Sequence, residues 1–173
     1  MTLELGGLRA TRIERGDGPG RAALQDLLER CADYMKLEDG APARPEAAAD
    51  LLDALPPGRA HEHKHVLGLA RAAGAPLVAV IDAVRGFPEP SDWFVGLVLI
   101  APAERRRGLG AAIIADLEDW FRRHGAAAAY LAVLERNPEA QRFWIRLGYQ
   151  LLDRRVRVTR EREDPVFRMK KLL

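Results

Sequence analysis

The sequence predicts an α/β domain with a mixed, mostly antiparallel sheet of about six or seven strands, flanked by about four helices. Two observations predict it. Apolar residues mark short strand-like and longer helical segments in the order strand, two helices, three strands, helix, strand, helix, two strands. The 173 residues contain no repeat, linker or low-complexity stretch. Residues 1–173 are therefore expected to form one domain with a sizeable core.

Turn residues set the element boundaries in the first half of the chain. Gly16-Asp17-Gly18-Pro19-Gly20 and Pro56-Pro57-Gly58 interrupt regular structure, and Gly74-Ala75-Pro76 suits a hairpin. The predicted elements are a strand at 8–15, a helix at 21–33, a loop at 34–45, a helix at 46–55 and strands at 65–72 and 77–85.

The second half contains the most apolar segment and a clear helix start. Asn137-Pro138 places asparagine at an N-cap and proline at the first helical position, while Gly125 and Gly148 suit helix ends. The predicted elements are a central strand at 92–100, a helix at 108–124, a strand at 128–134, a helix at 138–147 and terminal strands at 149–159 and 166–172.

Composition excludes several classes of protein. Hydrophobic content of 48% and charged content of 30% indicate a soluble globular chain, and a net charge of +2 is too small to indicate a nucleic-acid partner. The single cysteine, Cys31, excludes an internal disulfide framework and suits a reducing cytosol. Because no signal-peptide pattern and no run of about 18 apolar residues occurs, we expect a cytoplasmic protein without membrane contact.

The segment from Ile100 to Ala111 predicts a phosphate-binding turn. An apolar strand runs into Arg105-Arg106-Arg107-Gly108-Leu109-Gly110, and an amphipathic helix follows. A helix start directs main-chain N–H groups and partial positive charge outward. Gly108 and Gly110 lack a Cβ, so a bulky anion can approach the main chain. A P-loop is excluded because no Lys-Ser or Lys-Thr occurs, and Ile113 occupies the third small position that a dinucleotide fingerprint requires.

The pattern R-x-x-G-x-G at Arg105, Gly108 and Gly110 resembles the acyl-CoA signature of the GNAT superfamily of N-acetyltransferases. The run Asn137 to Tyr149 resembles that family's second signature, N-x-x-A-x-x-F-Y-x-x-x-G-F/Y. The two signatures occur in the family's order, within residues 94–150. Residues 1–90 match in element order, and in the family this half shapes the acceptor pocket.

The resemblance implies acetyl-CoA as co-substrate and no metal. It also implies that the main chain at Val98 and Ile100 pairs with the pantetheine arm. The diphosphate would be held mainly by main-chain N–H groups from Arg105 through Ala111, with Arg106 and Arg107 either reaching the nucleotide phosphate or facing water. The full set of cofactor-binding residues implied is Val98, Ile100, Arg105, Arg106, Arg107, Gly108, Leu109, Gly110, Ala111, Asn137, Ala140 and Phe143.

Catalytic residues are harder to assign because Trp144 stands where many family members have a tyrosine, the general acid. An indole N–H only donates hydrogen bonds and supplies no proton at useful pH. Three alternatives follow. Trp144 hydrogen-bonds the leaving thiolate without protonating it, Tyr34 or Tyr130 supplies the proton instead, or the protein has lost catalysis. Asp92 is the favoured general base because it begins the central strand with the parity of Val98 and Ile100; Asp82 and Glu135 remain alternatives.

The acceptor side is expected near the end of the first helix, where Asp33 and Tyr34 would contact the substrate. The carboxylate of Asp33 would suit a cationic amine. The acceptor is left as a small-molecule or peptide amine, and the chain as a monomer or homodimer. His61, His63 and His65 would lie about 7 Å apart on an extended chain, too widely spaced for one metal ion.

These features favour an acetyl-CoA-dependent N-acetyltransferase acting by direct attack in a ternary complex. The alternative is a non-catalytic acyl-CoA-binding module, which the tryptophan at 144 and the uncertain base would explain. A basic protein that binds nucleic acid through its arginines is the weakest interpretation.

Overall fold

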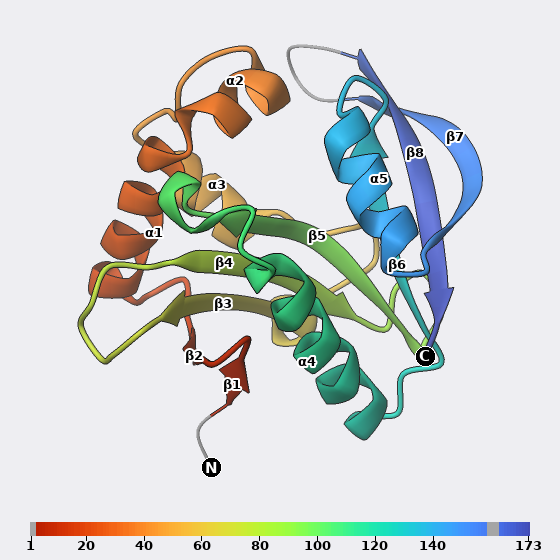
Figure 1. Cartoon of the computed structure of the whole chain (residues 1–173), viewed down its shortest axis with the longest axis horizontal. Coiled ribbons are helices and arrows are strands. Elements are labelled where there is room, and N and C mark those ends of the chain that lie inside the picture. Colours follow the sequence, from red (N-terminus) through yellow and green to blue (C-terminus); the bar gives the residue numbers. More distant parts are fainter. Residues whose placement is uncertain (1–2, 159–162) are drawn as a thin grey trace.

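A computed structural model describes residues 3–158 and 163–173 and contains one eight-stranded sheet in the order β1-β2-β3-β4-β5-β6-β8-β7 (Figure 1). Every neighbouring pair is antiparallel except β5 and β6, which are parallel. The strands are β1 (Glu4–Leu5), β2 (Leu8–Arg12), β3 (Lys64–Ala70), β4 (Ala79–Arg85), β5 (Asp92–Ile100), β6 (Ala128–Leu134), β7 (Gln150–Val158) and β8 (Glu163–Leu172).

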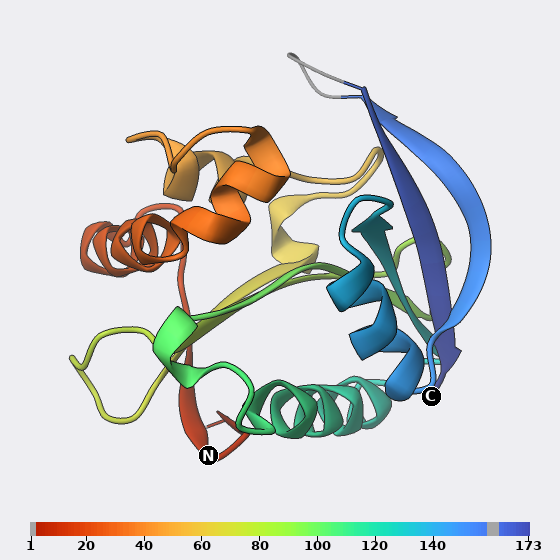
Figure 2. The same ribbon diagram turned by 45° about the horizontal axis from the view of Figure 1, so that its top comes forward.

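Five helices cover the two faces of the sheet (Figures 1 and 2). One apolar core lies beneath α4 and α5, and a second lies beneath α1, α2 and α3. The helices are α1 (Gly18–Arg30), α2 (Ala32–Asp39), α3 (Ala47–Asp53), α4 (Leu109–Arg123) and α5 (Pro138–Arg146), and short 3-10 turns span His61–His63 and Pro102–Glu104.

The predicted architecture is confirmed, with one strand and one helix more than the pattern predicted. The additional strand is β1, whose two residues are too few to show a period. The additional helix is α2, which begins at the end of the segment 21–33 predicted as one helix and continues into the segment 34–45 predicted as a loop. It was missed because Gly40, Pro42 and Pro45 indicated a loop, although the helix ends just before Gly40. The predicted end of the strand at 159 lies outside the described residues.

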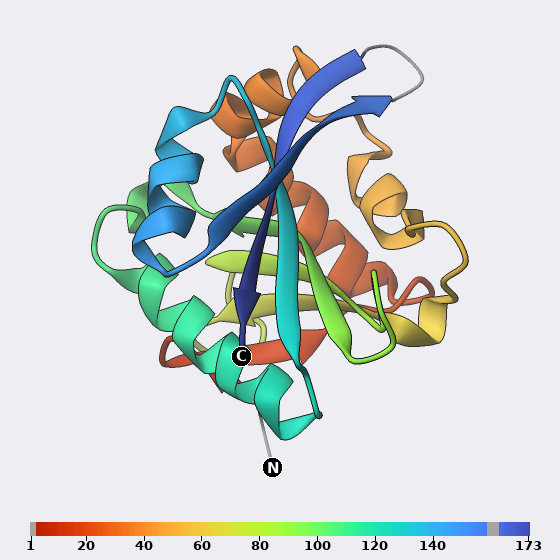
Figure 3. The same cartoon turned by 90° about the vertical axis from the view of Figure 1, so that its right-hand side faces the viewer.

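The sheet opens between β5 and β6. These strands pair only from Asp92 to Val95 with Ala128 to Leu131, and beyond that point they diverge. Figure 3 shows β6 and β8 turned steeply away from β3 and β4. A β-bulge accompanies the divergence, because Asp82 faces Leu97 while Ala83 faces Val95, which leaves Gly96 as the extra residue of β5.

The bulge reverses the alternation of side chains along β5. Trp93 and Val95 pack into the core beneath α4, and so do Val98 and Ile100, although the second pair has the opposite parity. Asp92 therefore lies on the other face from Val98 and Ile100. The prediction that they share a face was wrong, because an extra residue in a strand shifts every later side chain to the opposite side.

Candidate functional site

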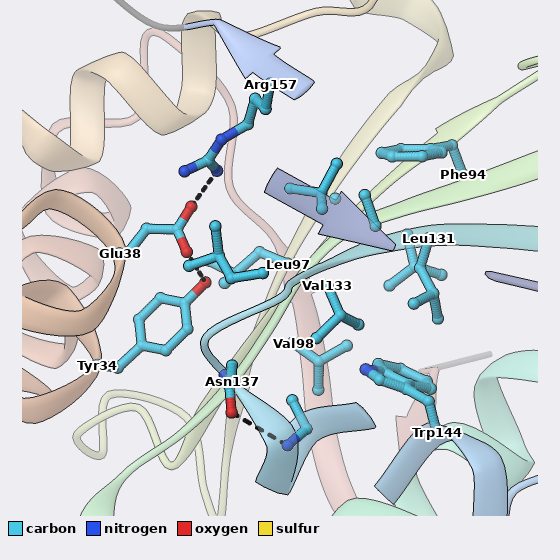
Figure 4. A pocket seen from close by; sticks show the side chains of 16 residues that line it. Tyr34, Glu38, Phe94, Leu97, Val98, Leu131, Val133, Asn137, Trp144 and Arg157 are labelled. Atoms are coloured by element: carbon cyan, nitrogen blue, oxygen red, sulfur yellow. Dashed lines mark hydrogen bonds and ion pairs between the residues drawn. The ribbon is translucent and has the colours of Figure 1, made fainter. Parts of the chain in front are cut away.

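A cleft occupies the space where β5 and β6 diverge (Figure 4). Most of the residues that line it have apolar side chains and come from the two strands and from α5. Four polar side chains line it as well: Tyr34 and Glu38 from α2, Asn137 at the start of α5 and Arg157 from β7. The apolar lining side chains are Phe94, Val95, Leu97, Val98, Leu131, Ala132, Val133, Leu134, Ala140, Trp144 and Val166.

The main chain of β5 faces this cleft at Val98 and Ile100. The N–H of Ala101 donates to the carbonyl of Val78 at 2.8 Å, so Ala101 faces the β4 side. Because the direction of main-chain groups alternates along a strand, the N–H and C=O groups of Val98 and Ile100 point away from β4. The carbonyl of Ile100 accepts a hydrogen bond from Nε of Arg105. Since no described strand pairs with β5 beyond Val95 on that side, the N–H and C=O of Val98 and the N–H of Ile100 are the groups available to an extended chain.

A cup of main-chain N–H groups lies just beyond the end of β5. Arg106 and Gly108 both adopt left-handed conformations, with φ of 62° and 77°. Within the described residues, none of the N–H groups of residues 106–111 donates to another group of the chain, and no side chain caps this end of α4. Because N–H groups at a helix start carry partial positive charge, this cup suits an anion.

The two glycines of the cup are required for different reasons. A Cβ on Gly108 would meet nothing within 4 Å, so this glycine is needed for its positive φ and keeps the space above the turn open. A Cβ on Gly110 would lie 3.3 Å from Ile100 and Phe143. Gly110 therefore allows α4 to pack closely against β5 and α5, and Leu109 beside it packs against the core.

The three arginines of this turn do not act alike. Arg105 turns inward: its Nε donates to the carbonyl of Ile100 at 2.7 Å, and its guanidinium pairs with Asp33 of α2. Arg106 is exposed at its side chain and lies 3.5 Å from Glu139, and Arg107 is exposed. The turn thus presents two cations outward and uses the third to tie α2 to the end of β5.

The start of α5 forms another wall of the cleft. The side-chain oxygen of Asn137 accepts a hydrogen bond from the N–H of Ala140 at 3.1 Å, which caps the helix as the sequence predicted. Ala140 lines the cleft, and Phe143 packs beside Gly110 and Trp144. Trp144 is buried, with its ring edge-on to Tyr149 at 5.0 Å.

The side of the cleft opposite α5 is formed by side chains of α2. The Tyr34 hydroxyl donates to Glu38 at 3.3 Å, and Arg157 forms an ion pair with the same carboxylate. Burial, and then the charge of Glu38, hold the pKa of Tyr34 well above its usual range, so this hydroxyl keeps its proton. The sequence predicted Tyr34 here. It did not indicate Glu38 or Arg157, which are 119 residues apart.

Residues 38–149 match the family model described as "Acetyltransferase (GNAT) family". The chain belongs to the GNAT family. No curated protein is significantly similar to the sequence.

Solved structures of GNAT proteins share the fold. A probable acetyltransferase from Chromobacterium violaceum superposes with a TM-score of 0.77 at 15% identity, covering 99% of this chain and 85% of the other. An acetyltransferase from Thermus thermophilus superposes with a TM-score of 0.69 at 20% identity, covering 100% of both chains. The ribosomal-protein-S18-alanine N-acetyltransferase from Escherichia coli superposes with a TM-score of 0.65 at 18% identity, covering 93% of this chain and 90% of the other.

Membership in the GNAT family implies an acyl-CoA co-substrate, and the residues present fit one. The unengaged N–H groups of residues 106–111 match a diphosphate, and the open space above Gly108 admits it. The N–H and C=O of Val98 and the N–H of Ile100, with Asn137 and Ala140 on another wall of the cleft, fit the amide-bearing arm. Arg105 fits less well as a direct phosphate ligand, because its guanidinium is already engaged by Asp33 and Ile100.

The predicted general bases are not brought to the cleft. Asp92 is buried at the start of β5, where β5 and β6 are still paired, and it does not line the opening. Asp82 is buried in an ion pair with Lys64, whose Nζ lies 2.9 Å away; burial raises its pKa and Lys64 opposes that effect. Glu135 is bound by Arg154, which lowers its pKa. Within residues 3–158 and 163–173, Glu38 is instead the carboxylate that lines the cleft.

The histidine run is not extended as the spacing argument assumed. His61 and His63 lie in a 3-10 turn, and His65 packs in β3 between Trp93 and Trp120, with ring centroids 5.2 and 5.3 Å away. Among the described residues, no group of three His, Cys, Asp or Glu side chains is placed to hold a metal ion. In the same part of the chain, no helix is long and apolar enough to cross a membrane.

Proposed function

We propose that this protein transfers an acetyl group from acetyl-CoA to a primary amine by direct attack in a ternary complex. The observation that carries the proposal is the cup of unengaged N–H groups at residues 106–111, which lies just beyond the end of β5, the strand that forms one wall of the cleft. The GNAT membership supports the acyl-CoA half of the reaction. The cleft side chains of α2 support an acceptor site on the opposite side.

In the transfer, the neutral amine nitrogen bonds to the thioester carbonyl carbon, the carbon–sulfur bond breaks, and the proton lost by the nitrogen passes to solvent. The chain supplies position and polarity. The cup holds the diphosphate, and the N–H groups of Val98 and Ile100 are aimed where a thioester oxygen needs donors. Displacement of water from the cleft on binding would strengthen these hydrogen bonds.

Trp144 fits the proposal without acting as an acid. Its indole N–H donates one hydrogen bond and stabilises a thiolate without protonating it. A thiol of pKa about 8.5, by analogy with cysteine, leaves without prior protonation. Tyr34 is a poor acid because its pKa is raised. We therefore assign Tyr34 to the acceptor site and propose that the thiolate takes its proton from solvent.

The acceptor is proposed as a small-molecule or peptide amine. The structurally similar enzyme from Escherichia coli acts, by its name, on the alanine of a ribosomal protein, but at 18% identity that likeness extends only to the fold. A cytoplasmic location, a monomer or homodimer, and the absence of nucleic-acid and membrane partners remain predictions from the sequence.

The test is an amine-panel assay that detects the released CoA thiol, together with calorimetry of acetyl-CoA binding. Binding with amine-dependent thiol release supports the transferase. Binding with no release across alkylamines, polyamines, amino acids and peptides would show the non-catalytic acyl-CoA-binding module. No binding at high micromolar acetyl-CoA would overturn both.

A further inference from the structure

The helix α2 spans the open end of the cleft and is tied to both arms of the splayed sheet. At its first turn, Asp33 pairs with Arg105, which also bonds the carbonyl of Ile100 at the end of β5. At its last turn, Arg136 donates to the carbonyls of Leu37 and Glu38 at 2.8 and 3.1 Å from the loop after β6.

These ties suit the polarity of the helix. A carboxylate near the N-terminus and a guanidinium at the C-terminal carbonyls both oppose the helix dipole. Arg136 also pairs with Asp164 of β8, so the C-terminal tie is itself anchored to the sheet. The ties fix which side of α2 faces the cleft, and that side carries Tyr34 and Glu38 (Figure 4).

We propose that Glu38 and Tyr34 form the acceptor subsite and bind the ammonium group of an amine carried on an apolar chain. The subsite rests on the transferase function proposed above and names its substrate class. Glu38 is the carboxylate among the cleft-lining side chains, and its side chain is only 20% exposed. A partly buried carboxylate attracts a cation more strongly than an exposed one.

The neighbours of Glu38 leave room for a cation beside its carboxylate. The hydroxyl of Tyr34 donates to Glu38, and its oxygen can accept from a second donor, so the subsite offers acceptors to an –NH3+ group. The guanidinium of Arg157 is shared between Glu38 and Asp164, the latter at 3.2 Å. Arg157 therefore holds the Glu38 carboxylate in position. The apolar lining, which includes Leu97, Leu134 and Val166, selects an apolar substituent beside the ammonium.

The experiment measures binding of benzylammonium to the complex of the protein with CoA, by ligand-observed NMR. Aniline, of similar size and uncharged at neutral pH, and benzyl alcohol are the neutral comparison probes. We expect the wild type to bind benzylammonium about tenfold more tightly than either neutral probe, as for one charge-assisted hydrogen bond. Glu38→Gln abolishes this preference, while Glu46→Gln, an exposed glutamate of the segment before α3, leaves it unchanged.

A purely structural role for Glu38 predicts a different result. If Glu38→Gln weakens the charged and neutral probes equally, or if the wild type binds all three alike, the proposal is overturned. The wild-type comparison needs no variant, so the test stands even if Glu38→Gln does not fold. Charge-selective binding without thiol release would uphold the subsite and overturn the transferase, whereas thiol release from amines with no loss in Glu38→Gln would do the opposite.

Discussion

The two sides of the cleft are built by different means. The cofactor side is made of main chain: residues 106–111 lie in one turn, and glycine conformations set their geometry. The acceptor side is made of side chains, because α2 is held by arginines 72 and about 100 residues further along the chain. The first is a local property of one segment, and the second exists only in the folded protein.

This difference predicts different sensitivities. Substitutions at cup glycines should affect acyl-CoA and spare the acceptor, and substitutions at the ties of α2 should do the reverse. Gly96 belongs to both sides, because its bulge opens the cleft that they share.

The largest effect is expected at Gly96. A Cβ there would lie 2.8 Å from Oδ2 of Asp82, which is buried in its pair with Lys64. We expect Gly96→Val to lower the free energy of unfolding by about 2–3 kcal/mol and to weaken acyl-CoA and acceptor binding together. Urea denaturation and calorimetry measure both. Gly16→Val is the control, because a Cβ there meets nothing within 4 Å. Equal losses of stability and binding in the two variants would contradict a role for the bulge in shaping the cleft.

The next effect separates the two sides. Gly108 and Gly125 share a φ of 77° and open surroundings, at opposite ends of α4. Gly108→Ala and Gly125→Ala should therefore each destabilise the fold by about 1 kcal/mol through the left-handed conformation. Only Gly108→Ala should weaken acetyl-CoA binding, by about tenfold, because its methyl group intrudes on the cup. Calorimetry that found the same affinity for both variants would contradict the role of the cup.

Acid should lower the free energy of unfolding first through His65 and only at lower pH through Asp33. Burial against Trp93 and Trp120 lowers the pKa of His65 from 6.5 to about 4. Protonation thus favours the unfolded chain, and stability falls as pH drops from 6.5 to 4, by about 1 kcal/mol after allowance for partial exposure. The hydrogen bond from Arg105 lowers the pKa of Asp33 from its usual 3.8. Protonation of Asp33 therefore lowers the free energy of unfolding only below pH 3.8.

Urea unfolding midpoints measured from pH 6.5 to below pH 3.8 test whether His65 loses stability before Asp33 does. His65→Phe keeps an aromatic ring against both tryptophans and should remove the loss between pH 6.5 and 4. An unchanged pH dependence in that variant would assign the loss to another group.

The smallest effect is expected at the exposed tie of α2. Asp33→Asn should raise the KM for the amine by about threefold and leave the affinity for acetyl-CoA unchanged, because it loosens only the acceptor side. The matched control is Asp50→Asn on α3, which breaks the exposed ion pair between Asp50 and Arg44. A change in acetyl-CoA affinity with no change in KM would mean that Arg105 serves the cofactor, as the signature implied.

What the sequence predicted follows the same division. The strand–turn–helix around Gly108 and the cap at Asn137 depend on neighbours within a few residues, so their patterns were readable. The helix α2 was missed because the glycine and prolines from Gly40 to Pro45 indicated a loop, although they follow the helix. The pairing of Glu38 with Arg157 leaves no trace in spacing, and the expectation that Asp92 shares a face with Val98 and Ile100 was wrong because the bulge at Gly96 is set by the packing of β4 against β5.

The cup of N–H groups at residues 106–111 is tested most directly by NMR of the 15N-labelled protein titrated with acetyl-CoA. We predict that the amide resonances of residues 106–111 shift most, together with those of Val98 and Ile100, while the amide of Gly125 at the other end of α4 does not. Saturable binding that leaves the amides of 106–111 unmoved would contradict the account.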